Sequence, residues 1–295
     1  MSGRIIEVVA VAAMLAGSLA SQTHITPTNP AATHKDYRFN VQPMARVSVN
    51  NPYGSISVKP STGNVVVISA ALASDKVEVD NNLVGNHVDV RSHLLPGADA
   101  QSGRVDYEIQ VPADAGITLH STTGPLRAER LHGDVTLEGA AATVEIRDIV
   151  GGHVHVKTLN GPVTLTNVQD GHIEIDSLSG EVTLNGVTGP LVQVISTSGN
   201  INYIGDFGDG GDYRFTSHSG DIEATVPDST SADVSARSVR GEVHDDIPLQ
   251  PKAHTWFVIK EGSAFWGTIG RAAVSSTVVL RSFNGKIHLR KRTGK

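Results

Sequence analysis

The chain has 295 residues, of which 39% are apolar, 4% are aromatic and none is cysteine, and its formal net charge at pH 7 is −6. Disulfide bonds and cysteine-linked lipids are therefore excluded, and nothing points to nucleic acid, whose phosphates need clustered Lys and Arg. The apolar fraction is enough for a core, and the scarcity of aromatic residues predicts that this core is aliphatic.

Residues 1–20 have the pattern of an export signal peptide. Arg4 supplies a positive start, residues 8–16 form a short apolar run, and the small-x-small sequence that ends at Ala20 predicts cleavage after that residue. A retained N-terminal anchor is the alternative, although the run is short for a membrane span. We expect the chain to be exported, to the periplasm, the cell surface or the medium, and not to be integral to the membrane after cleavage.

The next two segments carry weaker signals. Residues 21–36 are rich in Ser, Thr, Pro, Asn and Ala, which predicts a disordered linker. Residues 37–115 alternate apolar and polar residues without a fixed period, and they predict an irregular N-terminal β part.

Residues 116–244 repeat one pattern around an anchor position. Around Gly180, for example, Ile173 and Ile175 lie seven and five residues before the anchor, and Val182 and Leu184 lie two and four after it. The anchors fall at positions 124, 142, 161, 180, 199, 220 and 241, and all are glycine except Ala142. A nearly constant number of residues between successive anchors indicates a repeat architecture. Glycine at each turn would permit a positive φ angle.

Each unit predicts two short strands joined by a turn, with one apolar face that a single unit cannot bury. Stacked units can bury it, because equivalent residues such as Val154, Ile173 and Val192 then form a ladder inside. We therefore predict an all-β fold, a parallel β-solenoid (β-helix-like) with two strands per coil of about 19 residues. A β-sandwich is the alternative.

The pattern breaks over residues 245–270 and returns in a final repeat and basic tail over residues 271–295. The break is predicted to cap or flank the C-terminal end of the solenoid, where open strand edges need cover. An exposed aromatic ligand platform is the alternative. Most of the large aromatic residues gather in this break: Trp256, Phe257, Phe265 and Trp266.

Residues 210–227, with the sequence GGDYRFTSHSGDIEATVP, carry the clearest family signal, and residues 107–112, 197–201 and 283–287 hold shorter versions of it. This series resembles the recurring stretch of the DUF4097 family of exported bacterial proteins described as adhesins. The resemblance covers roughly residues 37–290. It implies an all-β repeat domain at the cell envelope and carries over no catalytic residue.

Equivalent positions in successive coils should become neighbours on the surface. His153 would lie beside His172, and His155 beside Glu174, so these four predict a patch whose donors suit zinc or another transition metal. A solvated polar row is the alternative.

Two acidic groups are also candidate sites. Asp206, Asp209 and Asp212 lie on a glycine-rich loop and offer the oxygen ligands that calcium prefers, with a plain acidic turn as the alternative. A column one residue after the anchors is predicted to bring like charges side by side, where they repel. Its members are Glu181, Asn200, Asp221 and Glu242.

The sequence contains no nucleophile elbow, phosphate-binding loop or zinc-protease motif, so we predict no catalytic or cofactor-binding residue and no cofactor beyond calcium or zinc. We expect a non-enzymatic structural or interaction module of the cell envelope, with a cell-surface glycan or an envelope protein as partner. A polysaccharide-active β-helix enzyme, either a lyase or a glycosidase, is the first alternative, and a concave groove with two acids and a basic residue would favour it. A self-assembling scaffold whose ends stack is the second, and an uncapped terminal coil would favour that.

Overall fold

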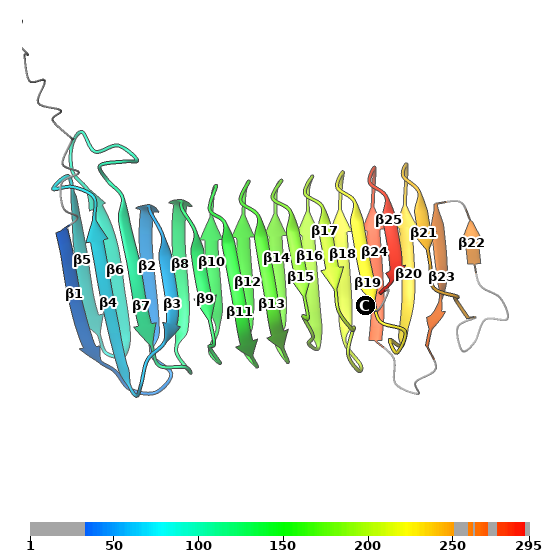
Figure 1. The fold of residues 1–295 in the computed structure, drawn as a ribbon, viewed down its shortest axis with the longest axis horizontal. Helices are drawn as coiled ribbons and strands as arrows, with labels where there is room; N and C mark the ends of the chain where they lie inside the picture. Colours follow the sequence, from blue (N-terminus) through cyan, green and yellow to red (C-terminus); the bar gives the residue numbers. More distant parts are fainter. Residues whose placement is uncertain (1–32, 251–258, 262, 271–275, 293–295) are drawn as a thin grey trace, which may run out of the picture. The chain divides into compact units, whose positions relative to one another are not determined.

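The computed structural model describes residues 33–250, 259–261, 263–270 and 276–292. These residues form 25 strands in two sheets, and none of them belongs to a helix that could cross a membrane (Figure 1). The predicted signal peptide lies outside the described residues. Residues 33–36, which the sequence analysis assigned to the linker, begin the first strand because their backbone pairs with residues 69–72.

We call the twelve-stranded sheet sheet A and the thirteen-stranded sheet sheet B. In spatial order sheet A consists of β1 (Thr33–Asn40), β4 (Val65–Leu72), β7 (Val105–Val111), β3 (Ile56–Pro60), β9 (Leu126–Glu129), β11 (Val144–Val150), β13 (Val163–Gln169), β15 (Val182–Asn185), β17 (Ile201–Ile204), β19 (Ile222–Val226), β25 (Ile287–Lys291) and β21 (Val243–Asp245). Sheet B consists of β22 (Ile259–Glu261), β23 (Ala264–Ile269), β20 (Ala232–Ser238), β24 (Ser276–Ser282), β18 (Asp212–Ser217), β16 (Leu191–Ser196), β14 (His172–Ser177), β12 (His153–Thr158), β10 (Val135–Gly139), β8 (Gly116–Thr123), β2 (Arg46–Tyr53), β6 (His87–Leu94) and β5 (Val77–Val84).

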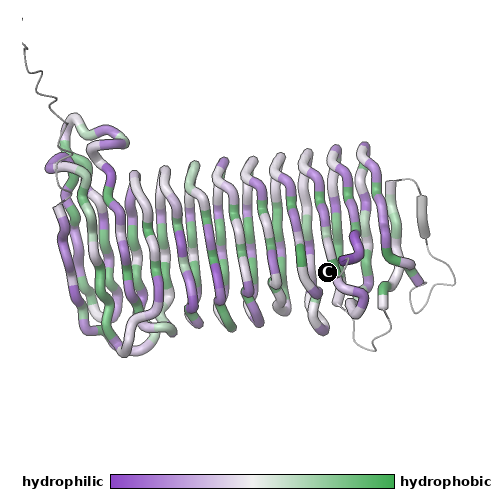
Figure 2. Tube along the Cα trace, viewed as in Figure 1, coloured by the Kyte–Doolittle hydropathy of each residue, from purple (hydrophilic) through white to green (hydrophobic). Residues whose placement is uncertain are grey.

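One strand of sheet B followed by one strand of sheet A makes a coil, and the coils stack in parallel register. Val154 pairs with Ile173, and Ile173 pairs with Val192, on three adjacent parallel strands. All three side chains are buried. The predicted solenoid and its internal ladder are therefore confirmed. Figure 2 shows apolar and polar segments alternating along each coil, as expected when every second side chain points inward.

The core departs from the aliphatic prediction, most of all at one cluster of aromatic rings. Tyr203, Phe207, Tyr213 and Phe215 are fully buried together, and the rings of Tyr203 and Phe207 stack with centroids 4.8 Å apart. The hydroxyl of Tyr203 donates to the carbonyl oxygen of Val187 at 3.0 Å. Burial raises the pKa of Tyr203 above its usual range.

The anchor glycines are required by close packing of the turns, so the predicted role of positive φ is wrong for most of them. Gly161 and Gly180 are not among the residues with positive φ. A Cβ on Gly180 would lie 2.0 Å from the carbonyl oxygen of Gly161 in the preceding coil, so no side chain fits there. At the one anchor that is alanine, Ala142, the neighbouring residue 139 is a glycine. A Cβ added to Gly139 would lie 2.8 Å from the Cβ of Ala142, so the glycine makes room for the alanine.

The terminal coils do not lie at the ends of the stack, which corrects the simple order implied by the sequence. The coil β24–β25, the final repeat, lies between the coil β18–β19 and the coil β20–β21. At the other end the coil β2–β3 lies between β8–β9 and β6–β7. The first and last described coils are thus each flanked on both sides.

Antiparallel strands flank the described coils at both ends of sheet B and at one end of sheet A, whose other edge is the short parallel strand β21. β4 pairs with β7 and β1 with β4 on sheet A, and β5 pairs with β6 on sheet B. At the opposite end β23 pairs with β20 and β22 with β23. Phe265 of β23 is fully buried, and Ile247 and Leu249 pack against the core before it. Trp256 and Phe257 lie outside the described residues, so their predicted role in the cap stays a prediction.

Candidate functional site

A groove runs along the outer face of sheet B. Its volume is about 610 Å³, and side chains from six neighbouring coils line it, those that contain β2, β8, β10, β12, β14 and β16. Two parallel columns of side chains form it. One column is charged and the other is largely apolar, and both run along the stacking direction of the coils.

The charged column, which we call the charge ladder, consists of His120, Glu138, Lys157 and Asp176. Strand pairing places His120 beside Glu138, Glu138 beside Lys157, and Lys157 beside Asp176. His120 Nδ1 lies 3.0 Å from Glu138 Oε2. Base and acid therefore alternate from coil to coil, about 4.8 Å apart. Alternation of this kind is favourable, because directly opposite like charges on neighbouring strands repel.

The sequence analysis did not single out the charge ladder, although a signal for it exists. Each member lies four residues before an anchor. Their side chains point outward because the residues on either side of each point into the core.

The apolar column, which we call the apolar rim, consists of Ala140, Leu159 and Leu178 in the turns after β10, β12 and β14. Leu159 is 51% exposed and Leu178 is 48% exposed, and Ile195 at the end of the groove is 45% exposed. The amide of Leu178 donates to the carbonyl oxygen of Thr158 at 3.0 Å, which continues the inter-coil hydrogen bonds into the turn. Exposed apolar residues that align in this way are typical of an interaction surface.

Buried serine hydroxyl groups hold two of the turns that line the groove, those of Leu178 and Thr197. Ser177 Oγ donates to the carbonyl oxygen of Gly180 at 2.9 Å, and the amide of Gly199 donates to Ser196 Oγ at 2.9 Å. Both serines lie three residues before an anchor, so Ser-x-x-Gly closes these turns locally. The groove is therefore lined by turns whose backbone is held by hydrogen bonds within each turn.

The predicted histidine patch forms on the same face. His153 Nε2 lies 2.9 Å from His172 Nδ1, and His155 Nδ1 lies 3.5 Å from Glu174 Oε2. The backbone amide of His153 also donates to Asp134 Oδ1 at 3.0 Å. Within the described part of the chain no three His, Asp or Glu side chains are grouped as metal ligands. The pairs are as the register predicts, and metal binding by them stays a prediction.

Two of the three predicted calcium ligands accept hydrogen bonds from other side chains. Asp206 Oδ1 accepts a hydrogen bond from the hydroxyl of Thr230 at 3.0 Å. Asp212 Oδ1 accepts from Arg214 Nε at 3.0 Å, and this hydrogen bond raises the pKa of the guanidinium. Asp209 lies between them in the chain. Calcium binding by these three residues remains a prediction.

The predicted acidic column is interrupted, and this corrects the expected repulsion. Because the coil β24–β25 is inserted, Lys286 comes between Asp221 and Glu242. Its amide donates to Asp221 Oδ1 at 2.7 Å, and its Nζ lies 3.7 Å from Glu242 Oε2. A hydrogen bond from His244, together with Lys286, holds the pKa of Glu242 below its usual range. Glu181 is similarly engaged with Asn202 rather than with another acid.

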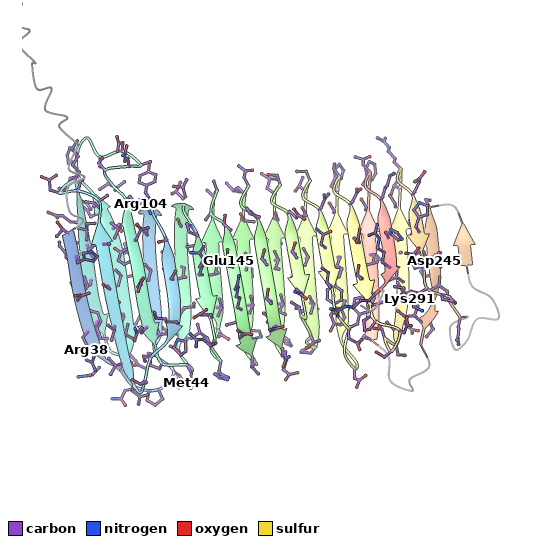
Figure 3. All side chains as sticks on the ribbon, viewed as in Figure 1. Arg38, Met44, Arg104, Glu145, Asp245 and Lys291 are labelled. Atoms are coloured by element: carbon purple, nitrogen blue, oxygen red, sulfur yellow. The ribbon has the colours of Figure 1, made fainter. Side chains whose placement is uncertain are left out.

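Two other surfaces differ from the groove. On sheet A lies Glu145, which is labelled in Figure 3. Its carboxylate is 3.1 Å from Arg127 and 3.6 Å from Arg147, so its charge is satisfied within the chain. Near the C-terminal end of sheet B, Trp266 is 37% exposed and lines a hollow of about 520 Å³ with Arg237 and Arg281. The predicted aromatic platform would lie here, and it contains one described tryptophan.

The fold and the groove define a class of protein, a β-solenoid with closed ends and lateral surfaces made of side-chain columns. The family model described as Toastrack DUF4097 matches residues 44–287, and the chain therefore belongs to the DUF4097 family. The resemblance stated from residues 210–227 is confirmed.

Solved structures and curated proteins were compared as well. The chain is similar to a "putative adhesin" from Bacteroides fragilis NCTC 9343, with 10% identity and a TM-score of 0.49 over 88% of this chain and 98% of that chain. It is also similar to a "putative cell adhesion protein" from Clostridium sporogenes ATCC 15579, with 12% identity and a TM-score of 0.28 over 88% of this chain and 100% of that chain. No curated protein matches the sequence.

Proposed function

We propose that this protein is a non-enzymatic interaction module that is exported to the cell envelope and binds its partner through the groove on sheet B. The observation that carries the proposal is the groove itself, in which a charge ladder and an apolar rim run side by side across consecutive coils. Such a surface suits an extended partner, a cell-surface glycan or an envelope protein, held by many shallow contacts. Little entropy is lost on binding, because the groove is already ordered.

A binding screen tests this function. The chain would be tested against purified glycans, isolated cell wall and envelope proteins, with and without calcium or zinc. We expect saturable binding that Leu178→Ser weakens, because it removes part of the apolar rim. Leu83→Ser is the matched control, since Leu83 is 37% exposed on β5, away from the groove. Equal loss of binding in both variants would contradict the proposed site.

Export is a separate part of the proposal. It is supported by the positive start, the short apolar run and the small-x-small sequence of residues 1–20. Cell fractionation followed by N-terminal sequencing of the envelope form would test it. A mature chain that begins at Ser21 is expected, and a chain confined to the cytoplasm would contradict this part.

A second candidate function is polysaccharide cleavage, because the groove holds two acids, Glu138 and Asp176, with Lys157 between them. Pairing across two coils separates the two acids by about 9.6 Å along the stack, near the upper limit for inverting glycosidases. However, the general acid of such enzymes is normally a buried carboxyl. Glu138 is 41% exposed and paired with His120. Product release that Glu138→Gln and Asp176→Asn abolish would establish the enzyme instead of the binding module.

A further inference from the structure

We propose that the partner of the sheet B groove is a second copy of this chain, which lies across it with its coils in the opposite order. The inference rests on the proposed function, because it names the partner of the same groove. It is carried by the charge ladder, in which base, acid, base and acid follow one another over four coils. Read from the other end, the order is acid, base, acid and base. When two copies meet with their coils in opposite order, each acid of one charge ladder therefore faces a base of the other.

The geometry of a closed homodimer makes this complementarity usable. Two identical faces meet around a two-fold axis, and here the axis would run along the strands, between β10 and β12. Glu138 then faces Lys157 of the second copy, and Lys157 faces Glu138. His120 faces Asp176 in the same way. Packed sheets lie about 10 Å apart, a distance that long Lys and Glu side chains span.

The groove is centred on the proposed axis. Its lining begins on β2 with Asn50 and ends on β16 with Ile195. In order across the sheet, β2, β8 and β10 lie on one side of the axis, and β12, β14 and β16 lie on the other. The hollow thus extends equally in both directions from the point where Glu138 and Lys157 meet.

The same charges select this register against its neighbours. A parallel arrangement would set every member of the ladder against its own copy. Sliding the second copy by one coil in one direction would set Glu138 against Glu138, and sliding it in the other direction would set Lys157 against Lys157. Like charges that face each other across an interface repel and suppress the wrong arrangement.

Neighbouring columns on sheet B agree with the register. Asp134, which precedes β10, would face His153 of the second copy. In the column that contains His155, Asp89 on β6 would face Arg214 on β18, because β6 and β18 lie equally far from the axis. In the column of the charge ladder, beyond its four members, Asp80 on β5 would face Arg281 on β24. Each of these pairs joins an acid to a base.

The apolar rim fits the same arrangement. Leu159 would face Ala140 of the second copy, and Leu178 would face Thr122, so each large side chain meets a smaller one. Leu159 and Leu178 are half exposed in the single chain, and docking would remove them from water. Charges set the register and the leucines add affinity.

Reciprocal charge reversal tests the proposal in the full chain. Lys157→Glu sets the new carboxylate against Glu138 of the second copy, and Glu138→Lys sets two lysines together. By sedimentation velocity we expect a wild-type dimer, and monomers for each single variant. An equimolar mixture of the two variants should form dimers again, and so should the double variant Glu138→Lys/Lys157→Glu. Lys59→Glu on β3 of sheet A makes the same charge change away from the groove and should remain dimeric. Thermal unfolding of every variant checks that it is folded.

Several outcomes would overturn the inference. A wild-type chain that stays monomeric at concentrations of about 1 mM would do so, since a weaker association is not specific recognition. Dimers that persist in both single variants would place the interface elsewhere, and a mixture that fails to dimerise would exclude the antiparallel register. A monomeric chain that still binds a glycan, with Leu178→Ser weakening it, would leave the proposed function standing and remove only the self-association.

Discussion

The substitution Gly180→Ala should destabilise the solenoid far more than the addition of one methyl group suggests. The new Cβ would lie 2.0 Å from the carbonyl oxygen of Gly161 and 2.7 Å from its carbonyl carbon, whereas ordinary contact begins near 3.4 Å. Both atoms belong to backbone, so no side chain can rotate away. The two coils must therefore separate by about 1 Å, which costs the bonds that join them.

The cost can be worked from those bonds. The amide of Ser179 donates to the carbonyl oxygen of Leu159 at 2.8 Å, and the amide of Val163 donates to the carbonyl oxygen of Glu181 at 2.8 Å. These two hydrogen bonds lie on either side of Gly180. Stretching both beyond hydrogen-bond range removes about 1 kcal/mol each. The remaining overlap adds about 1–3 kcal/mol, as overpacking does in cores. We expect the free energy of unfolding to fall by about 3–5 kcal/mol in total.

Urea unfolding followed by far-ultraviolet circular dichroism measures this loss. Gly116→Ala is the matched control, because the nearest atom to its Cβ would be the carbonyl oxygen of Asp134 at 3.8 Å. Its effect should stay within about 0.5 kcal/mol, as for surface substitutions generally. If the two variants differ by less than about 1 kcal/mol, close packing of the turns does not explain the anchor glycines.

Three further predictions concern the turns and the buried tyrosines. Gly139→Ser should destabilise, because its Cβ would lie 2.8 Å from that of Ala142, and adding Ala142→Gly should recover about 1–2 kcal/mol in a double-mutant cycle by urea unfolding. Tyr203→Phe should cost about 1–3 kcal/mol in thermal unfolding, because the carbonyl oxygens of Val187 and Asp206 share its hydroxyl proton and would lose it. Tyr213→Phe should cost little, since the Tyr213 hydroxyl has no hydrogen-bond partner among the described residues. Burial raises the pKa of Tyr107 to about 12, so the unfolded chain, with a pKa of about 10, loses its proton first as pH rises. Below about pH 10 Tyr107 should therefore have no effect on how stability changes with pH, and between about pH 10 and about pH 12 it should lower the free energy of unfolding by up to about 2.7 kcal/mol. In the variant Tyr107→Phe, the midpoint of urea unfolding should fall less over this pH range. An alkaline decline that is the same in wild type and variant would contradict the last prediction, and equal costs at the other two tyrosines would contradict the second.

The internal ladder could be predicted because two simple periods act together. Side chains alternate along a strand, and the anchor step brings equivalent residues of successive coils side by side, so Val154, Ile173 and Val192 can meet in only one register. The same rule predicts that His153 lies beside His172. Wherever a coil follows its neighbour in both sequence and space, the sequence is sufficient.

The order of the terminal coils could not be predicted in this way. Every coil offers two apolar residues at the same spacing, so Val278 and Leu280 match the coil before them as well as any other coil would. The apolar pattern fixes the register between two strands but not which strands are neighbours. For this reason the sequence did not predict that Lys286 lies between Asp221 and Glu242 in the acidic column.

The charge ladder was missed for a different reason. Its members share a position, four residues before an anchor, but they differ in residue type from coil to coil. The histidine patch stood out because identical residues repeat, and repetition of one residue type is easy to see. Complementary surfaces depend instead on alternation, which becomes visible only when the residues are read down a column of the sheet.

The closed ends explain why the lateral faces are the natural place for a partner. A stack of coils can meet another molecule through its terminal edges or through its sides. Among the described strands, antiparallel strands occupy the edges at β1, β5 and β22, and the remaining edge strand, the parallel β21 of sheet A, has only three residues, a length that discourages further pairing. Stacking of ends into a scaffold is therefore disfavoured.

Of the two sides, sheet A holds its acid Glu145 between two arginines of the same sheet, Arg127 and Arg147. Sheet B leaves Lys157 on β12 and Asp176 on β14 exposed, and Leu178 lies beside them in a turn that the buried Ser177 holds in place. Because base and acid alternate every coil, a one-coil slip reverses attraction into repulsion. A rigid repeat can thus recognise a partner in one register without any enclosed pocket.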